Sequence, residues 1–277
     1  MDIYLKILFD EELLACVTFF FCRDAGLNKR YTMNQPQTGT MNYLVSEGVL
    51  HIHTNQVIDQ EFGYICFEYY RQGKCLDIFD TLLLEEAQGR EKVLDLCCGA
   101  GATVHALATS NPDIIYAIDN NPSSLSFLRN TLASIHDGFS GEVVVKAGDA
   151  HEIDLEDHLL DFVVCRAALQ YLDVPAVLKE MFRVLNANGK LFLLVHGSGY
   201  IFDYIGSRKR FYHKKTMSFL AKGMKRGGSL SKVKFLKISA LERKLRKAGF
   251  KNVRCIRSAG WDIFGRFPVY FGVVAEK

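Results

Sequence analysis

The feature that most constrains the fold is a short apolar run followed by closely spaced glycines, in the stretch Lys92–Ala108 (KVLDLCCGAGATVHALA). The run Val93–Leu96 is typical of a strand that is buried on both faces of a sheet. Gly99 and Gly101 follow it, and glycine allows positive φ and close approach of the backbone to a ligand. Residues Ala102–Ala108 then favour a helix. Strand, glycine turn and helix in this order form the first half of a nucleotide-binding βαβ unit.

A second apolar run, Ile114–Ile118, supplies the next strand of such a unit and ends in Asp119. Asp119 lies 18 residues beyond Gly101, close to where an acid binds the ribose hydroxyls in sites of this type. The spacing therefore predicts that the glycine turn and Asp119 hold one ligand between them. A glycine turn in an α/β core with no cofactor is the alternative.

Three kinds of cofactor loop compete for this stretch. A nicotinamide or flavin site requires GxGxxG, and Val104 stands at the third glycine position. A phosphate-binding P-loop requires a Gly-Lys-Ser/Thr sequence, and this stretch has no lysine after its glycines. The segment Leu94–Gly101 (LDLCCGAG) resembles the first motif of the class I S-adenosylmethionine-dependent methyltransferases, which reads hydrophobic-Asp-hydrophobic-Gly-Cys-Gly-x-Gly. Cys97 takes the place of the first glycine of that motif.

Further segments are similar to the same family. Gly148-Asp149-Ala150 resembles its Gly-Asp-Ala segment, whose acid meets the adenine amine, and Arg166–Leu172 resembles the stretch beside the sulfonium end of the cofactor. RVLNANGKLFLLV, from residue 183 to 195, is close to its Arg-Val-Leu-x-Pro-Gly-Gly-x-Leu pattern. The resemblance thus implies S-adenosyl-L-methionine as cofactor and a set of contacting residues: Asp95, Cys97, Gly99, Ala100, Gly101, Asp119, Asn120, Asp149, Ala150 and Arg166.

The chain from residue 93 onward alternates strand and helix patterns, which predicts an α/β fold with a Rossmann-like, mostly parallel sheet and helices on both faces. A helix at Ser123–Ser134 is introduced by Asn121 as N-cap and Pro122 at N1. We expect another at Val174–Ala187. The seven expected strands are 93–96, 114–118, 142–147, 161–165, 190–196, 251–256 and 269–275. The last two agree with the antiparallel end of the methyltransferase sheet.

Two regions fall outside the resemblance. Residues 1–90 are expected to form an accessory or cap region before a methyltransferase domain at 91–277. Within residues 1–90, the apolar stretch Leu13–Cys22 predicts a buried helix, and Val49–Val57 predicts a strand or hairpin. His51 and His53 would share a strand face there, but without a third ligand they do not predict a metal site.

The second region is an insertion after the fifth strand, Tyr200–Lys237. It holds eleven Lys or Arg residues and one acid, Asp203, although the whole chain has a formal charge of only +3. The position after the fifth strand places it as a lid over the ligand crevice. Such a lid would attract an anionic partner such as a phosphate, carboxylate, coenzyme-A thioester or nucleic acid. A solvated loop that only adds solubility is the alternative.

Composition sets the wider limits. The chain has 277 residues, 49% of them hydrophobic, which suits one large globular domain. Its eight cysteines include no CxxC pair, which favours a reduced, cytoplasmic location. The ten apolar residues of Leu13–Cys22 follow three acids and are too few to cross a bilayer, so neither a secretory leader nor a membrane span is expected.

Methyl transfer from a sulfonium requires a base only where the acceptor must lose a proton to attack. His196, at the end of the fifth strand, is the candidate base, and His151 and His158 are weaker ones. A structural histidine is the alternative. The stretch Arg166–Leu169 replaces the Asn-Pro-Pro-Tyr-type sequence of amino-group methyltransferases, which disfavours adenine, cytosine or glutamine as acceptor.

The sequence therefore predicts an enzyme that methylates a small, anionic or aromatic metabolite, closest in pattern to methyltransferases of quinone biosynthesis and natural-product tailoring. A nucleic-acid methyltransferase that docks through Tyr200–Lys237 is the first alternative. A cofactor-binding protein without catalysis is the second. The oligomeric state and the acceptor atom, whether C, O, N or S, are left open.

Overall fold

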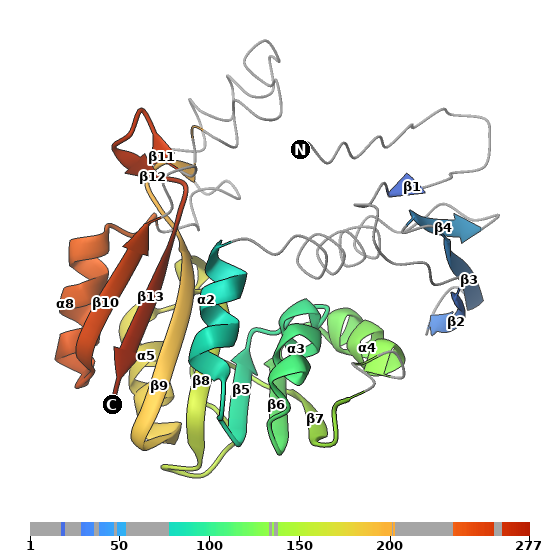
Figure 1. Ribbon diagram of the computed structural model, residues 1–277, viewed down its shortest axis with the longest axis horizontal. Helices are drawn as coiled ribbons and strands as arrows, with labels where there is room; N and C mark the ends of the chain where they lie inside the picture. Colours follow the sequence, from blue (N-terminus) through green and yellow to red (C-terminus); the bar gives the residue numbers. More distant parts are fainter. Residues whose placement is uncertain are drawn as a thin grey trace.

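The fold is built on a seven-stranded sheet with helices packed against it (Figure 1). The computed structural model describes residues 78–132, 135, 138–200, 202, 235–257 and 262–277, together with the backbone of four strands within residues 18–53. The strand order is β10-β13-β9-β8-β5-β6-β7, and only β13 runs antiparallel to its neighbours. The strands are β5 (Lys92–Leu96), β6 (Ile114–Asp119), β7 (Glu142–Ala147), β8 (Leu160–Arg166), β9 (Leu185–His196), β10 (Lys251–Arg257) and β13 (Tyr270–Glu276).

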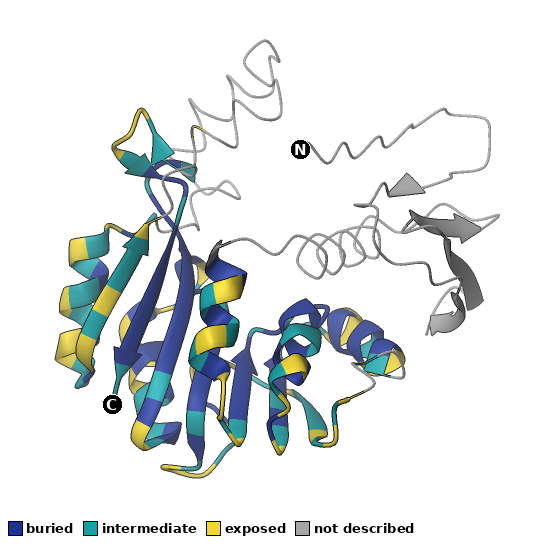
Figure 2. Ribbon diagram, viewed as in Figure 1, coloured by how far each residue is buried: buried dark blue, intermediate teal, exposed yellow. Residues whose placement is uncertain are grey.

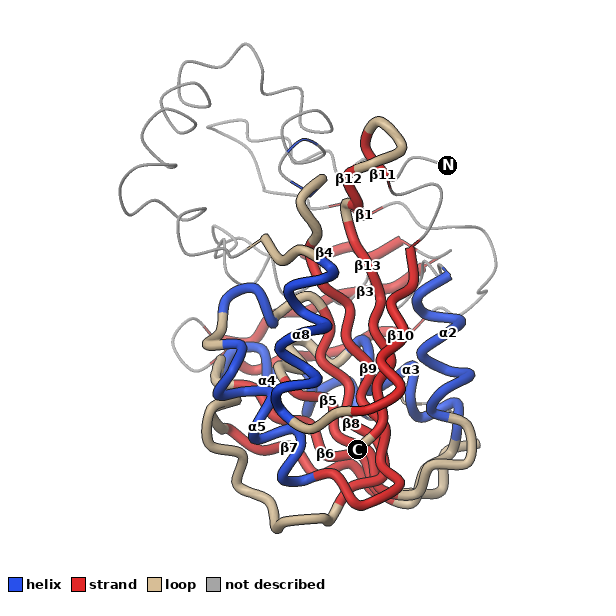
Figure 3. Tube along the Cα trace, turned by 90° about the vertical axis from the view of Figure 1, so that its left-hand side faces the viewer, coloured by secondary structure: helices blue, strands red, loops and turns tan. Residues whose placement is uncertain are grey.

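Helices cover both faces of this sheet, α8 and α5 on one side and α2 and α3 on the other (Figure 3). The buried residues form two clusters, one on each face, with α4 packed on the same face as α2 and α3. The central strands are buried along most of their length, and the exposed residues lie on the outer faces of the helices, on the edge strand β10 and in the loops (Figure 2). The helices are α2 (Ile78–Ala87), α3 (Ala102–Leu107), α4 (Pro122–Thr131), α5 (Val174–Val184) and α8 (Ile238–Ala248).

The predicted α/β class, the strand count and the mostly parallel sheet are confirmed. Local chemistry explains several element ends. The Asn121 side chain accepts a hydrogen bond from Ser124 N at 3.0 Å and caps α4, whose first residue is Pro122. Gly249 ends α8 at φ 107, the left-handed conformation that glycine adopts without strain.

Helix α5 ends earlier than its sequence predicts. The predicted helix ran to Ala187, but the structure begins β9 at Leu185. Leu185 pairs with Leu160, and after an irregularity in the register Lys190 pairs with Phe162. In the strand, the Leu185 side chain is buried in the core. The free energy gained by this burial exceeds the small preference of leucine for a helix.

The N-terminal part of the chain contains a small antiparallel sheet in the order β1-β4-β3-β2. Its strands are β1 (Thr18–Phe19), β2 (Lys29–Gln35), β3 (Gly39–Ser46) and β4 (Val49–His53). The predicted helix at Leu13–Cys22 is wrong where the structure describes it, because β-branched Thr18 and aromatic Phe19 pair with β4 as a strand. The predicted strand from Val49 is confirmed as far as His53. The side chains of His51 and His53 and most of the insertion 200–237 lie outside the described residues.

Helix α2 precedes the predicted domain boundary at residue 91 and packs on the main sheet. Phe79, Leu83 and Ala87 are buried in one core cluster with residues of β8, β9 and β13. Gly272 leaves space for Phe79, since a Cβ on Gly272 would lie 3.2 Å from the Phe79 ring. Helix α2 therefore shares the core of the main sheet, while the division into residues 1–90 and 91–277 stays a prediction.

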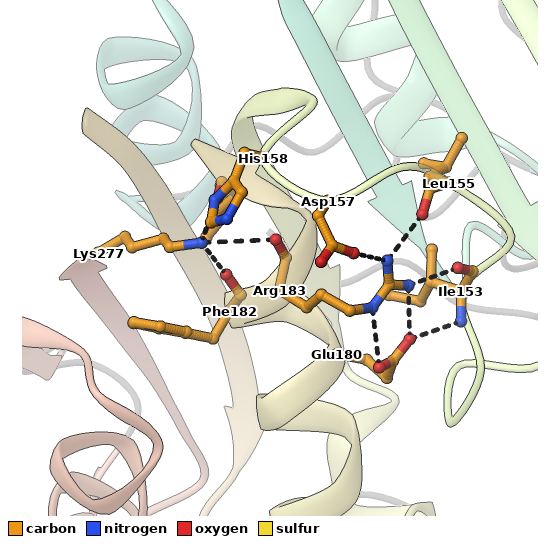
Figure 4. A network of polar contacts seen from close by, with 9 residues as sticks. Ile153, Leu155, Asp157, His158, Glu180, Phe182, Arg183 and Lys277 are labelled. Atoms are coloured by element: carbon orange, nitrogen blue, oxygen red, sulfur yellow. Dashed lines mark hydrogen bonds and ion pairs between the residues drawn. The ribbon is translucent and has the colours of Figure 1, made fainter. Parts of the chain in front are cut away.

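One arginine fixes the loop that follows β7 onto α5 (Figure 4). Arg183 donates hydrogen bonds to the carbonyl oxygens of Ile153, at 2.7 Å, and Leu155, at 2.8 Å. The same guanidinium pairs with Glu180 at 2.7 Å and Asp157 at 2.6 Å, and these hydrogen bonds raise the pKa of Arg183. Arg183 opens the RVL segment noted above, so this network accounts for an arginine at that point of the sequence.

The C-terminal residue completes the same region. Lys277 Nζ donates to the carbonyl oxygen of Phe182 at 2.6 Å and contacts His158 Nδ1 at 2.9 Å (Figure 4). A cation at the C-terminal end of a helix is favourable because the last carbonyl groups have no partner within the helix. Lys277 thereby joins the end of β13 to the end of α5.

Candidate cofactor site

A cavity of about 560 Å³ lies at the carboxyl ends of β5, β6, β7 and β8. The strand order changes direction between β5 and β8, because the chain continues from β5 to β6 on one side and from β8 to β9 on the other. This is the point at which open α/β sheets bind their ligands. The volume lies within the range of small-molecule and cofactor sites, roughly 300–1,000 Å³.

The glycine bend closes one side of the cavity in a run of left-handed residues. Cys97, Gly99 and Gly101 have φ values of 62°, 51° and 84°. A Cβ on Gly101 would lie 2.2 Å from Leu128 Cδ1, so this glycine is required for α4 to pack against the bend. Cys97, at the position where the family motif has glycine, holds a conformation that is strained for any residue with a side chain.

Asp119 holds the bend in place. Its Oδ2 accepts a hydrogen bond from Gly99 N and its Oδ1 accepts one from Asn121 N, both at 2.8 Å. The Ile118 carbonyl oxygen also accepts from Cys97 N at 2.7 Å and from Cys98 N at 3.1 Å. The end of β6 therefore sets the shape of the loop that follows β5, and Asp119 also lines the cavity.

Asp95 lies directly behind this loop and does not line the cavity. It is 1% exposed, and its Oδ2 has no hydrogen-bond partner among the described residues. Burial raises the pKa of Asp95 to about 8; the charge of Asp119 adds to the rise and Arg166 opposes it. At neutral pH the Asp95 carboxyl is therefore mostly protonated.

The loop after β7 contributes a second carboxylate. Asp149 Oδ1 accepts hydrogen bonds from the His151 backbone N, at 2.9 Å, and contacts the ring Nδ1, at 2.6 Å. These bonds lower the pKa of Asp149, which remains ionised. His151 Nε2 accepts from the Asp173 backbone N at 3.0 Å, so this loop is connected to the start of α5.

Arg166, at the end of β8, forms a buried ion pair with Asp80 of α2. The side chains are 11% and 2% exposed. Arg166 is the only Lys or Arg among the described residues that line the cavity, and its charge is compensated by Asp80. The pair connects the N-terminal helix of the described core to the site. Sequence reasoning missed Asp80, which lies 86 residues from Arg166 and belongs to no motif.

His196 lies outside the cavity lining, in a group of aromatic rings. It is 5% exposed and stacks on Tyr200 with the ring centroids 3.9 Å apart. Tyr270 meets it edge-on at 5.0 Å, and Tyr171 does so at 6.3 Å. Tyr171 is 56% exposed and lines the cavity, so a layer of aromatic side chains continues from the cavity wall to His196. No spacing within the sequence groups these four residues.

The structure thus places eight of the eleven predicted site residues on the cavity wall and the other three behind it. Those that line it are Cys97, Gly99, Ala100, Asp119, Asn120, Asp149, Ala150 and Arg166. Asp95 is buried in β5, Gly101 packs against Leu128, and the ring of His196 contacts that of Tyr171. Apolar residues complete the wall: Ala167, Ala168 and Leu172 belong to the predicted stretch Arg166–Leu172, whereas sequence reasoning did not single out Leu96 and Ile118. No group of three metal-ligating side chains occurs in the part of the chain that the structure describes.

The lining favours a cationic adenosyl cofactor over a dinucleotide. Asp119 and Asp149 are its two carboxylates, and its one arginine is neutralised by Asp80. S-adenosylmethionine carries a sulfonium and an ammonium group, which this charge attracts, whereas the pyrophosphate of a dinucleotide would be repelled. Carboxylates for ribose and adenine, with apolar residues between them, fit the adenosine moiety.

The comparisons with known proteins agree with this geometry. The sequence profile of a family described as "Methyltransferase domain" matches residues 93–189, from β5 to the start of β9. This match supports the expected class I S-adenosylmethionine-dependent methyltransferase for this part of the chain. S-adenosylmethionine is the cofactor of this family, and the expected family and cofactor are confirmed.

Two curated relatives each match less than half of the chain. An uncharacterized methyltransferase-like protein of Schizosaccharomyces pombe is 32% identical over 117 residues, which are 42% of this chain and 41% of that protein. A demethylmenaquinone methyltransferase of Bacillus cytotoxicus is 30% identical over 120 residues, which are 42% of this chain and 48% of that protein. The chain thus spans less than half the length of either relative.

A solved S-adenosylmethionine-dependent methyltransferase of Methanosarcina mazei shares the fold. It is 21% identical, with a TM-score of 0.53, and the alignment covers 73% of this chain and 99% of that one. At this identity the likeness concerns the fold of the methyltransferase domain. No helix in the described ranges is long and apolar enough to cross a bilayer.

Proposed function

We propose that the protein transfers a methyl group from S-adenosylmethionine to a small aromatic metabolite. The observation that carries the proposal is the half-exposed Tyr171, which lines the cavity and is backed by His196, Tyr200 and Tyr270. An aromatic acceptor stacks well against such a wall, because aromatic rings attract one another in offset or edge-on arrangements. The name of the Bacillus cytotoxicus relative, a demethylmenaquinone methyltransferase, points to an acceptor of the same chemical type.

An anionic acceptor, which the sequence also predicted, receives less support from the cavity. Among the described residues that line the cavity, Arg166 is the only Lys or Arg, and it already pairs with the buried Asp80. Attraction of an anion would therefore depend on the basic insertion, most of which lies outside the described residues. The described wall favours the aromatic acceptor over the anionic one.

The residues divide into two roles. Asp119 and Asp149 would hold the adenosine moiety, with Ile118 and Leu172 against its ring, and the bend at Gly99 would allow close approach. The bound cofactor supplies an electrophilic methyl group on its sulfonium. The chain's part is to hold the acceptor in line with that group and to exclude water, which is the main protein contribution to such a displacement.

His196 remains the candidate base by prediction, and its position favours a positioning role. Its ring is buried and stacked on Tyr200, and it lies nearly perpendicular to the ring of Tyr171, which lines the cavity. We infer that His196 fixes the Tyr171 ring. The variant His196→Gln tests this. A positioning role predicts a higher KM for the acceptor and an unchanged dependence of the rate on pH. A base role predicts that the part of the pH–rate profile governed by the titration of the histidine disappears.

The experiment that tests the function measures transfer of labelled methyl to aromatic acceptors such as hydroquinones and catechols. Wild-type protein is expected to methylate at least one of them. Tyr171→Ala is expected to raise the acceptor KM about tenfold, from loss of one aromatic contact, while the cofactor Kd changes little. Tyr116→Ala, on β6 and absent from the cavity wall, serves as the matched control. Cofactor binding without transfer to any acceptor would support the non-catalytic alternative.

One observation supports a nucleic-acid acceptor as a second candidate. Helix α8 exposes Arg243, Arg246 and Lys247 on its outer side, and no carboxylate among the described residues forms an ion pair with them. A face of this kind suits phosphate contacts. Transfer to RNA that falls steeply with salt, and that Arg246→Gln weakens, would favour this candidate over a small metabolite.

A further inference from the structure

The hairpin formed by β11 (Asp262–Ile263) and β12 (Phe267–Pro268) stands at the carboxyl end of the main sheet (Figure 1). Its base is fixed to the segment that leaves β9. Gly197 N donates to Val269 O and Gly199 N donates to Pro268 O, both at 2.8 Å. A Cβ on either glycine would lie 2.2 Å from a backbone oxygen of the hairpin, so the two segments are in close contact. The base of the hairpin is therefore fixed against the segment that leaves β9.

The turn at the tip is unfavourable for the residue that occupies it. Phe264 and Gly265 have φ values of 54° and 64°, and Arg266 N donates to Ile263 O at 3.2 Å. Two successive left-handed residues form a turn that favours Asn-Gly or Asp-Gly. A bulky side chain at positive φ is an outlier, because its Cβ crowds the backbone. The backbone geometry thus disfavours phenylalanine here.

The same phenylalanine is also unfavourably solvated. The Phe264 side chain is 85% exposed, the most of any large apolar residue in the described part of the chain. Phe202, also exposed, lies beside Phe267 of the same hairpin, with 6.0 Å between the ring centroids. Phe264 is thus unfavourable in two ways, because a bulky residue has a positive φ and an apolar side chain is exposed to solvent. Such exceptions to local preferences are expected where function requires them.

Positive charge accompanies these aromatic rings. Arg266 follows at the tip and is exposed, with no ion-pair partner among the described residues. Arg257, at the end of β10, pairs with Asp262 at 2.9 Å and also donates to the Arg266 carbonyl oxygen. The hairpin thus carries exposed apolar rings and, on the same short turn, the Arg266 guanidinium, which lies 5.6 Å from the centroid of the Phe267 ring. This combination suits the headgroup region of an anionic bilayer, where apolar rings insert and cations meet lipid phosphates.

The size of the tip decides between a membrane and a protein partner. A stable protein interface buries about 800 Å² on each partner, far more than a three-residue turn with one phenylalanine provides. A membrane surface requires only a few inserted side chains for weak, reversible attachment. We propose that the hairpin Asp262–Pro268 docks the protein to an anionic lipid surface, with Phe264 inserted and Arg266 against the phosphates. This inference goes beyond methyl transfer and depends on neither the cofactor nor the acceptor.

The test is sedimentation of the full-length protein, without cofactor, with vesicles of phosphatidylcholine alone or with added phosphatidylserine. We expect binding to the anionic vesicles that weakens with salt. Phe264→Asn is expected to weaken it about tenfold, the equivalent of one phenylalanine withdrawn from the apolar phase. The same variant is expected to unfold at an equal or higher temperature, because Asn suits the turn. Phe264→Trp should retain binding.

The control for net charge is Arg243→Gln on α8, which removes the same charge as Arg266→Gln from a different surface. We expect Arg266→Gln to weaken binding several-fold more than Arg243→Gln. Absence of vesicle binding, equal binding by Phe264→Asn, or equal losses in the two arginine variants would each overturn the proposal. A dimer that disappears in Phe264→Asn would assign the tip to a protein partner and would overturn it as well. Vesicle binding is measured without cofactor or acceptor, and methyl transfer and cofactor affinity are measured in separate experiments. A negative result for methyl transfer would therefore not change the conclusion from vesicle binding.

Discussion

The two sides of the site are built in different ways. On the side of β5, β6 and β7, backbone N–H groups and carboxylates within residues 95–149 hold one another, as Asp119 does with Gly99 and Asn121. On the side of β8, β9 and β13, four aromatic residues between 171 and 270 meet only because the strands bring them together. The first arrangement is written in a short motif and suits a cofactor common to a family. The second joins residues that are far apart in the sequence, and we propose that it receives the acceptor.

The largest expected effect lies where the two sides meet, at the ion pair of Asp80 and Arg166. Asp80→Asn would leave a buried guanidinium without its counterion, and we expect a loss of about 3–5 kcal/mol in the free energy of unfolding. Asp154→Asn breaks the exposed pair with Lys146 and should cost less than about 1 kcal/mol. Urea unfolding of both variants measures the difference. Equal losses would mean that the ion pair does not join the two sides.

The second effect is a pH dependence on the cofactor side. The pKa of Asp95 is raised to about 8 by burial, so the folded state keeps a proton that the unfolded state releases above its ordinary pKa. Because the folded state binds more protons, stability should fall as pH rises through this window, by up to about 1.4 kcal/mol per pH unit. Between pH 5 and 7 this amounts to about 3 kcal/mol. In urea unfolding, the free energy of unfolding of Asp95→Asn should depend less on pH over the same window than that of the wild type. The same pH dependence in both proteins would contradict the prediction.

The third effect separates the two cofactor carboxylates. Asp119→Asn weakens the acceptor of two backbone hydrogen bonds at the bend, and we expect about 2 kcal/mol lower cofactor affinity, or roughly 30-fold in Kd. Asp149→Asn, on a more exposed loop, should change Kd only a few-fold. Calorimetric titration with S-adenosylhomocysteine compares the two. The reverse order would place the principal contact at Asp149.

The smallest effect tests the strain at Cys97. Cys97→Gly and Cys97→Ala both remove the thiol, but only glycine relieves the left-handed backbone, so the Gly variant should be more stable by about 1 kcal/mol. At Cys98, whose φ is not positive, the Ala variant should instead be more stable than the Gly variant, because glycine adds entropy to the unfolded chain. Thermal unfolding of the four variants decides. The same order at both positions would show that the bend is unstrained.

The comparison also explains what the sequence could predict. The strand at 142–147 and the cap at Asn121 were predicted because period, cap and turn residues act over a few positions. The strand at Thr18–Phe19 was missed because its pairing with β4 is a distant contact. Similarly, Asp80 and Tyr270 carry no local signal of their nearness to the site. Motif reasoning therefore finds the cofactor side and fails for the acceptor side.

The central claim is that the bend between β5 and α3, together with Asp119, holds an adenosyl sulfonium. Calorimetric titration of the purified protein with S-adenosylmethionine and, separately, with NAD tests it most directly. Saturable one-site binding of S-adenosylmethionine that Asp119→Asn weakens, with no heat from NAD, is the predicted result. Binding of NAD with no response to S-adenosylmethionine would contradict the account.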